Sequence, residues 1–240
     1  MRFLAVLIFV YVVLFEFILP VNKYLPKPSL LYESITHIWQ DYSLLYAISI
    51  STSMVIVSLL AGYFSSYINA ASIFKTAERN IGVVNALKIF LYVPVIFCVA
   101  LFSFWFSEYY FAEFLFVLLV SVVLSYSALF RCTLKVHSAY VDVAKNLGLT
   151  PTDVYQKVYW KSSQPLFTNE YFSIHRLMWG AVLVFEFVVN AHGIGHVMRL
   201  VLEYRDFTAL INIALMISVL VFIGDSIIRF IRHKFITWID

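Results

Sequence analysis

The sequence has few charged residues. Only 13% of its 240 residues are charged whereas 62% are hydrophobic, and a soluble domain needs a more polar surface than this composition can supply. Stretches without any Asp, Glu, Lys or Arg cover residues 42–74, 89–107 and 114–130. Such stretches reach the roughly 20 residues that a helix needs to cross a bilayer. The shortage of charge therefore excludes a soluble protein and predicts an all-α polytopic membrane protein.

Cysteine is also scarce, and the usual ATP-binding motif is absent. Cys98 lies within a predicted span and Cys132 at the end of one, so the two cysteines indicate neither a disulfide framework nor a metal site. The sequence has no Gly-x-x-x-x-Gly-Lys-Ser/Thr phosphate loop, which excludes that way of binding ATP. It also lacks solenoid-type repeats and low-complexity tracts, so we expect residues 1–240 to form a single transmembrane domain.

The apolar stretches predict about six transmembrane helices. We expect them at about residues 3–21, 43–65, 87–106, 112–131, 171–190 and 207–228. If the N-terminus lies in the cytoplasm, thirteen Lys and Arg residues fall on the inner side and four on the outer side. This distribution satisfies the positive-inside rule, which the opposite orientation would violate. We therefore expect both termini and the connecting segment 132–170 to be cytoplasmic.

The connecting segment contains the polar stretch VDVAKNLGLTPTDVYQKVYWKSSQP, residues 141–165. Residues 139–147 have helical character, and Gly148 follows them as a residue that can close a helix at positive φ. Thr150, Pro151 and Asp153 then resemble an N-cap, a proline at the first helical position and an acidic residue three after the cap. We expect this second helix to run to about Lys161. A helix–turn–helix of this kind is suited to docking in a groove on a partner, but an ordinary solvated loop fits the pattern equally well.

The same residues carry a resemblance to a known family. Asp142, Ala144, Gly148, Val158 and Pro165 follow the order of the "EAA" loop of binding-protein-dependent ABC transporter permeases, with Asp142 and Val143 in place of the usual Glu and first Ala. Three further segments, residues 25–35, 90–106 and 175–198, resemble the nitrate, taurine and alkanesulfonate branch in the same order. The sequence is thus similar to a type I importer permease over most of its length from Leu25 onward.

The resemblance implies a function and a set of partners. The chain would be the permease subunit of an ATP-driven importer for a small solute, multi-pass in a bacterial-type inner membrane and surrounded by lipid. It would pair with a second copy of itself, a dimer of ATP-binding subunits and an extracytoplasmic substrate-binding protein, and it would bind no nucleic acid. ATP and Mg²⁺ would belong to the ATP-binding partner, which leaves this chain without a cofactor and without enzymatic activity of its own.

The resemblance also implies roles for loop residues. The segment at about 132–170 would be a coupling loop, in which Gly148 sets the turn, Ala144 allows close approach and Asp142 makes polar contacts with the ATP-binding subunit. The residues expected to couple this chain to that subunit are Asp142, Ala144, Gly148, Leu149, Thr150 and Asp153. The identity of the solute is not specified by these residues, since the binding protein usually sets that choice.

Glu186 is the candidate for a residue of the path or gate. It lies inside the fifth predicted span, where a charge costs at least about 2.5–3.5 kcal/mol unless it is paired or wet. The alternative is a carboxyl that is hydrogen-bonded to a neighbouring helix. Gly193 and Gly195 predict a tight turn near the same gate. Ser58 belongs to a small-residue face with Ser51, Gly62 and Ser65, which can line a path but in membranes more often lets helices pack closely.

A second functional hypothesis rests on two histidines. His192 and His196, with Glu186, could serve a membrane-embedded metal-dependent or acid/base enzyme. A metalloprotease motif needs Glu directly after the first His on an unbroken helix, and the two intervening glycines make such a helix improbable. A third metal ligand is also lacking in this pattern. We therefore expect no metal site and favour the transport hypothesis.

Overall fold

The described part of the chain is built entirely from helices. The computed structural model describes residues 2–19, 26–79, 82, 86, 92–106, 109–190 and 192–236, and no strand occurs among them. The helices are α1 (Arg2–Val13), the π-helix η1 (Leu14–Ile18), α2 (Pro28–Asp41), α3 (Leu44–Ile68), α4 (Ala70–Arg79), α6 (Val95–Trp105), α7 (Tyr109–Thr133), α8 (Ser138–Asn146), α9 (Pro151–Asp153), the π-helix η2 (Val154–Tyr159), α10 (Trp160–Val189), α11 (Ile194–Glu203) and α12 (Phe207–Phe235). The expected all-α fold class is confirmed.

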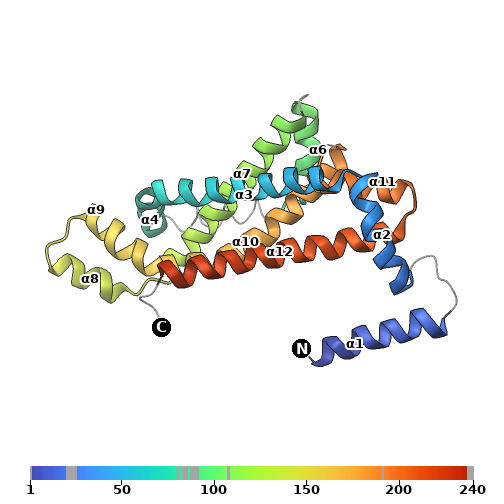
Figure 1. Ribbon diagram of the computed structural model, residues 1–240. Helices are drawn as coiled ribbons and strands as arrows, with labels where there is room; N and C mark the ends of the chain where they lie inside the picture. The colour runs from blue at the N-terminus through green and yellow to red at the C-terminus, as the bar shows by residue number, and fades with distance from the viewer. Residues whose placement is uncertain are drawn as a thin grey trace.

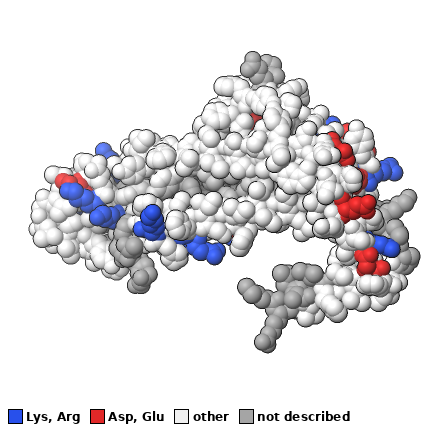
Figure 2. Space-filling model, viewed as in Figure 1, with Lys and Arg blue, Asp and Glu red and all other residues white. Residues whose placement is uncertain are grey.

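The helices form an elongated bundle with two distinct ends (Figure 1). α3, α10 and α12 run along its length and α7 crosses them obliquely, while α1 lies apart from the others. We call the end that carries α4, α8 and α9 the loop end, and the end that carries α2 and α11 the turn end. On the face shown in Figure 2, Lys and Arg gather mainly at the loop end, Asp and Glu mainly at the turn end, and the middle is nearly free of charge. This distribution suits a bundle whose middle lies in lipid.

Four helices are long and apolar enough to cross a membrane. They are Leu44–Ile68, Tyr109–Thr133, Pro151–Val189 and Phe207–Phe235, and they correspond to four of the predicted spans. Two shorter apolar helices, Phe9–Ile18 and Val95–Trp105, lie within the predicted first and third spans. Residues 20–21 and 87–91 of those two spans lie outside the described residues. The predicted 42–74 stretch is divided at Asn69, where α3 ends and α4 begins.

α3 and α7 pack closely through small residues. A side chain at Gly62 would overlap the hydroxyl of Ser121 and press on that of Ser125. The Ser121 hydroxyl donates to the backbone carbonyl of Ser58 at 2.6 Å, and the Ser125 hydroxyl bonds the Tyr171 hydroxyl of α10 at 2.9 Å. Close approach of backbones through small and hydroxylated residues is how membrane helices gain packing contacts. The small-residue face of α3 is therefore buried against α7 and α10 at these positions.

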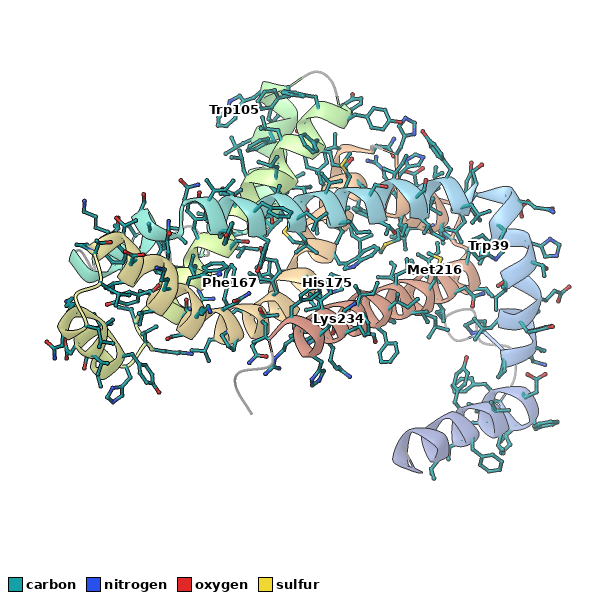
Figure 3. All side chains as sticks on the ribbon, turned by 60° about the vertical axis from the view of Figure 1, so that its left-hand side comes forward. Trp39, Trp105, Phe167, His175, Met216 and Lys234 are labelled. Carbon is teal, nitrogen blue, oxygen red and sulfur yellow. The ribbon has the colours of Figure 1, made fainter. Side chains whose placement is uncertain are left out.

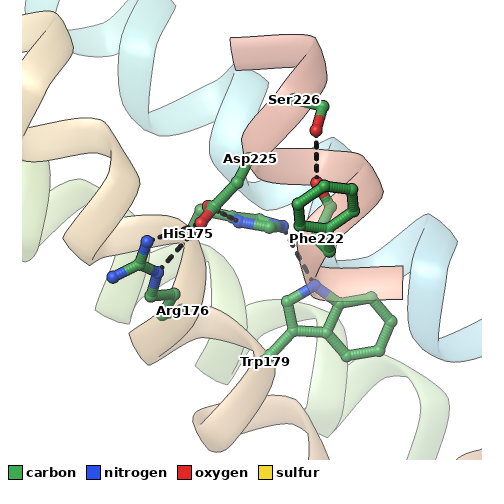
Figure 4. A network of polar contacts seen from close by, with 6 residues as sticks. All are labelled: His175, Arg176, Trp179, Phe222, Asp225 and Ser226. Carbon is green, nitrogen blue, oxygen red and sulfur yellow. Dashed lines mark hydrogen bonds and ion pairs between the residues drawn. The ribbon is translucent and has the colours of Figure 1, made fainter. Parts of the chain in front are cut away.

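A buried polar network joins α10 to α12 (Figure 4). The indole N–H of Trp179 donates to Nε2 of His175 at 3.0 Å, and Nδ1 of His175 contacts Oδ1 of Asp225 at 3.0 Å. Because the indole can only donate, Nε2 must be the acceptor, and the ring proton therefore resides on Nδ1 and is donated to Asp225. Arg176 donates to the other carboxylate oxygen from Nε and Nη2, at 3.0 and 2.6 Å.

The network lies within a core that also contains large aromatic side chains. Phe167 is fully buried in α10, stacked on Tyr63 of α3, and lies inside the bundle as His175 does (Figure 3). A side chain at Gly224 of α12 would overlap the His175 ring, so α12 approaches α10 closely at this point. α10 is thus the central helix, in contact with α3, α7, α11 and α12.

Candidate functional site

At the loop end, α8 ends in a Schellman motif centred on Gly148. The N–H of Gly148 donates to the carbonyl of Lys145 at 3.0 Å, and the N–H of Leu149 donates to that of Ala144 at 3.2 Å. Gly148 has a φ of 80°, which glycine adopts readily because it has no Cβ. The prediction that Gly148 closes the first helix of the loop is confirmed.

Thr150 begins the second helix, as its sequence context predicts. Its hydroxyl accepts the N–H of Asp153 at 3.2 Å and donates to the Asp153 carboxylate at 2.6 Å, while Pro151 occupies the first helical position. The Asp153 carboxylate also pairs with the ammonium group of Lys157 at 2.7 Å. These contacts satisfy amide groups that every helix leaves without an intrahelical partner at its start.

The second helix is much longer than the sequence predicts. Instead of ending near Lys161, it continues through the π-helical turns of η2 into α10, so that one helix of 39 residues runs from Pro151 to Val189. Pro165 lies in its interior, where it lacks the N–H of one helical hydrogen bond. The prediction failed because the change from polar to apolar residues marks where a span begins, whereas the cap at Thr150 marks where the helix begins. The second helix of the loop and the fifth predicted span are therefore one continuous helix.

α8 presents an apolar row to solvent. Tyr140, Val143 and Leu147 are 62%, 58% and 75% exposed, and helical spacing places them on one side of α8. Val141 and Ala144 are buried on the other side, and α8 packs there against η2. Ala144 thus allows close approach between two helices of this chain. An exposed apolar row of this kind is unusual on a helix outside a membrane and is typical of a docking surface.

The remaining predicted coupling residues lie around the same turn. Asp142 is exposed and has no hydrogen-bond or ion-pair partner among the described residues. It lines a hollow of about 290 Å³ between α4, α8 and the end of α7. Leu149 is half-buried, whereas Thr150 is exposed. The structure therefore brings all six predicted residues together, with Ala144 turned inward and Asp142 free to bind another molecule.

At the turn end, Glu186 is fully buried near the end of α10. Its Oε1 accepts the hydroxyl proton of Ser51 at 2.6 Å, and its Oε2 accepts the N–H of Gly195 at 2.7 Å. The Ser51 hydroxyl oxygen in turn accepts the N–H of Ile194 at 2.9 Å. A carboxylate placed at the first turn of α11 satisfies amide groups and interacts favourably with the helix dipole. Glu186 therefore joins α10, α3 and the start of α11.

Two glycines allow this close approach. Gly193 has a φ of 125°, and a side chain there would overlap the carboxylate of Glu186. A side chain at Gly195 would overlap the carbonyl of Leu183 and Cβ of Glu186. The backbone between α10 and α11 can lie against the carboxylate only because both residues lack a Cβ. The tight turn predicted from these glycines is confirmed, and it forms one site with Glu186.

Ser58 lies elsewhere. It is seven residues along α3 from Ser51, which corresponds to about 10 Å at 1.5 Å per residue. Its hydroxyl donates to the carbonyl of Val55 in its own helix, and it faces α7. Of the four residues predicted for the path or gate, the structure groups Glu186, Gly193 and Gly195, and it places Ser58 in the interface between α3 and α7.

Glu113 is a residue of the turn end that the sequence pattern did not single out. It lies in the first turns of α7, is fully buried, and its carboxyl contacts that of Glu186. The available signal was its position directly before the charge-free stretch 114–130, inside a helix otherwise fit to cross a membrane. What the sequence could not supply was its neighbour, because the two glutamates are 73 positions apart in the chain and meet only through the packing of α7 against α10.

The two histidines make contacts away from Glu186. The His192 ring stacks on Tyr110, with 5.1 Å between ring centroids, and Nδ1 of His196 contacts the side-chain oxygen of Asn190 at 2.9 Å. The hydrogen-bond donors to Glu186 are instead Ser51 and Gly195. Within the described part of the chain, no group of three or more His, Cys, Asp or Glu side chains is placed to hold a metal ion.

His196 lies in α11, outside the four long apolar helices. Its partial burial, followed by the nearby His192 and Arg199, lowers the pKa of its imidazole below the ordinary value of 6.5. Burial and positive neighbours both disfavour the imidazolium form. At neutral pH the His196 ring is therefore neutral and bonds Asn190 without carrying a charge.

Comparison with known proteins places these features in a family. The family model described as the binding-protein-dependent transport system inner membrane component matches residues 79–237, which include α8 and α9 of the loop end and α11 of the turn end. No curated protein matches the chain. Among solved structures, a chain of the MetNI methionine ABC transporter in inward-facing conformations is similar, with a TM-score of 0.61 and 16% identity over 78% of this chain and 94% of that chain.

The two matches carry different conclusions. At 16% identity, the likeness to the MetNI chain shows the fold, and it confirms the expected type I ABC importer permease architecture. The family model covers more than half of the 240 residues, including α7, α8, α10 and α12. The chain therefore belongs to the family of inner membrane components of binding-protein-dependent transport systems, the permeases of ABC transporters.

Proposed function

We propose that this chain is the transmembrane subunit of an ATP-driven importer for a small solute. It acts with a second copy of itself, a dimer of ATP-binding subunits and an extracytoplasmic substrate-binding protein. ATP and Mg²⁺ bind to the partner subunits, and this chain catalyses no covalent reaction. The observation that carries the proposal is the exposed apolar row of α8, formed by Tyr140, Val143 and Leu147, beside the rigid turn at Gly148.

The row has the chemistry of a helix that docks in a groove. Its three side chains follow a spacing of three and four residues, which is how a helix presents an apolar face to a partner. Asp142 lies in the same helix and is available for a polar contact at the edge. We infer that this face meets the ATP-binding subunit, with Asp142, Leu149, Thr150 and Asp153 around it.

The long helix supplies a way to transmit movement. It begins beside the docking face at Pro151 and ends at Val189, three residues beyond Glu186. ATP-driven movement of the partner can shift a membrane equilibrium only through an element whose contacts differ between two states. We infer that this helix carries displacement of the loop to the turn end, where Glu186, Gly193 and Gly195 form part of the gate, with Ser58 along the path.

The distribution of Lys and Arg supports one orientation of the chain in the membrane. Lys and Arg predominate at the loop end of the visible face, which by the positive-inside rule supports a cytoplasmic location for that end (Figure 2), and we infer that both termini are cytoplasmic as well. We propose an inner membrane location of bacterial type. The segments 25–35, 90–106 and 175–198 favour the nitrate, taurine and alkanesulfonate branch, and therefore a small anion, a sulfonate or a similarly small polar solute.

The docking proposal is tested by recovery of the ATP-binding subunit. Tagged full-length chain is purified from its native membrane, and the recovered ATP-binding subunit is quantified per copy of chain. Replacing Tyr140 with Ala removes part of the docking face and is expected to lower recovery at least about tenfold, since an interface anchor contributes more than 1.4 kcal/mol. The matched control is Tyr204→Ala, which changes another exposed tyrosine, at the turn end.

Two results would contradict the proposal. One is that the wild-type chain, although it is inserted in the membrane, is recovered without any ATP-binding subunit. The other is equal recovery with Tyr140→Ala and Tyr204→Ala. Membrane insertion of each variant is checked separately by protease protection, so that loss of the chain itself is not mistaken for loss of the contact.

A further inference from the structure

Glu113 of α7 is a buried acid without a donor. Its side chain is fully buried, and neither of its carboxyl oxygens accepts a hydrogen bond from any described residue. Buried polar atoms are nearly always hydrogen-bonded, and an uncompensated carboxylate inside a membrane protein is strongly unfavourable. Glu113 therefore needs either a proton or a bound cation.

The group next to it is a second acid. The carboxyl of Glu186 is close enough to interact directly with that of Glu113. The charged form of Glu186 is already stabilised, because its two oxygens accept hydrogen bonds from Ser51 and from the backbone of Gly195. Hydrogen bonds of this kind favour the charged form of a carboxyl. Two carboxylates cannot bond each other, so a hydrogen bond between this pair requires one proton, and Glu113 is the member that lacks any other stabilisation.

The surroundings provide no positive charge to replace that proton. Neither glutamate has an ion-pair partner in the described part of the chain, and α6, which packs on α7 and α10, contains no charged residue. The titratable groups of the elements packed around the pair include Tyr46 of α3, Tyr110 of α7, His192 of the turn, and His196, Arg199 and Glu203 of α11, of which Arg199 already pairs with Glu203. Tyr46 and Tyr110 bond each other at 3.3 Å, His192 stacks on Tyr110, and His196 bonds Asn190.

We propose that Glu113 and Glu186 form a proton-binding site, in which Glu113 carries the proton and donates it to the Glu186 carboxylate. A metal ion fits the pair poorly. Calcium takes six to eight oxygen ligands and magnesium a complete octahedron, whereas two of the four carboxyl oxygens here are engaged by Ser51 and Gly195. Within the described residues no third His, Cys, Asp or Glu completes such a site.

The proposed proton lies where α3, α7, α10 and the start of α11 meet. Glu186 connects α10 to Ser51 of α3 and to the start of α11, and the shared proton adds Glu113 of α7 to the same junction. Loss of the proton would leave two adjacent buried negative charges, which repel each other and would drive the turn away from α7. The inference concerns a single chain and does not rest on the transport function.

The test measures the proton directly by infrared spectroscopy. The full-length chain, purified in a detergent without ester groups, is expected to show at neutral pH a C=O stretching band of a protonated carboxyl that shifts in heavy water. Growth with isotope-labelled glutamate is expected to displace the band, which assigns it to a Glu side chain without any mutation. Glu113→Gln is expected to abolish the band, whereas Glu33→Gln, at an exposed glutamate of α2, should leave it unchanged.

Glu186→Gln distinguishes the two members of the pair. The amide oxygen that it introduces can still accept the Glu113 proton, so the band is expected to persist at a shifted frequency. The proposal is overturned if the wild-type chain lacks the band, if isotope-labelled glutamate does not displace it, or if Glu186→Gln removes it while Glu113→Gln does not. If a variant fails to fold, the labelled wild-type measurement still shows whether a Glu carboxyl is protonated, and absence of such a band overturns the proposal.

Discussion

Gly193 lets a buried carboxylate reach the start of a helix. With a φ of 125° and no Cβ, it leaves room for the Glu186 side chain to accept the N–H of Gly195. The same carboxylate accepts from Ser51, which is 135 positions earlier in the chain. Intramembrane charge is expensive, and here two donors offset that cost. The turn end is therefore a hydrogen-bonded junction whose close contacts require glycine at position 193.

Replacing Gly193 with Ala tests this dependence. The new methyl group would overlap the Glu186 carboxylate, and the backbone conformation would be strained by about 1–3 kcal/mol. We expect a loss of at least that size in the free energy of unfolding, measured for the purified chain in detergent. Gly180→Ala is the matched control, because nothing lies within 4 Å of a Cβ there and its helical backbone suits alanine. Equal stability of the two variants would show that the turn does not need glycine.

The sequence predicted which single residues belong to the turn end better than it predicted which residues contact them. The cost of a charge within an apolar stretch singled out Glu186, and the glycine spacing predicted the turn. Ser51 and Glu113 could not be assigned to Glu186 in the same way, because they come from α3 and α7 and reach it only through tertiary packing. Arg176 likewise finds its partner, Asp225, on another helix.

Helix boundaries are controlled by local chemistry. The Schellman motif at Gly148 and the cap at Thr150 involve residues within a few positions of one another, and both were predictable from sequence. The length of the helix from Pro151 to Val189 was not, since hydropathy reports the entry into lipid and says nothing about whether a helix continues outside it. The proline at 165 did not end the helix either, because Trp160 before it and Phe167 and Tyr171 after it all pack on Tyr63 of α3.

The α10–α12 network makes a prediction for a pair of helices. Asp225→Asn would replace one carboxylate oxygen with an NH2 donor, so that either His175 or Arg176 would face a donor instead of an acceptor. Hydrogen bonds to charged groups are worth about 1.5–3 kcal/mol, and Arg176 is largely exposed, so we expect Asp225→Asn to cost about 1–2 kcal/mol of unfolding free energy. The measurement is denaturant unfolding in mixed micelles.

The neighbouring residue supplies the control for this variant. The Ser226 hydroxyl donates to the carbonyl of Phe222 within α12 and takes no part in the contact with α10 (Figure 4). Ser226→Ala should therefore change the unfolding free energy by less than about 0.5 kcal/mol. If both variants were equally stable, the network would contribute nothing to holding α12 against α10.

At the scale of the whole molecule, the two ends differ in charge and in chemistry. The loop end displays Lys and Arg together with the exposed apolar row of α8, while the turn end buries a pair of carboxyls beneath a glycine turn. One continuous helix, from Pro151 to Val189, connects them. We propose that movement driven by a partner's ATP hydrolysis is passed to the loop end and reaches the turn end through this helix.

A substitution at Gly148 tests this coupling most directly. Its φ of 80° is strained for any residue with a Cβ, although nothing lies within 4 Å of the position a Cβ would take. Gly148→Val therefore alters the angle between α8 and the long helix without creating an overlap. A strain of about 1.4–3 kcal/mol, within the usual range for such a backbone conformation, reduces the population of the docking conformation by roughly tenfold or more. Gly180→Val, in open space on α10, is the matched control.

The decisive measurement is the rate of ATP hydrolysis and of solute uptake by the purified complex in vesicles, per copy of inserted chain. We expect Gly180→Val to match the wild-type chain and Gly148→Val to lose at least about tenfold in uptake, through either a lost ATP-binding subunit or hydrolysis without transport. Normal uptake and normal hydrolysis with Gly148→Val would contradict the role of the loop in coupling.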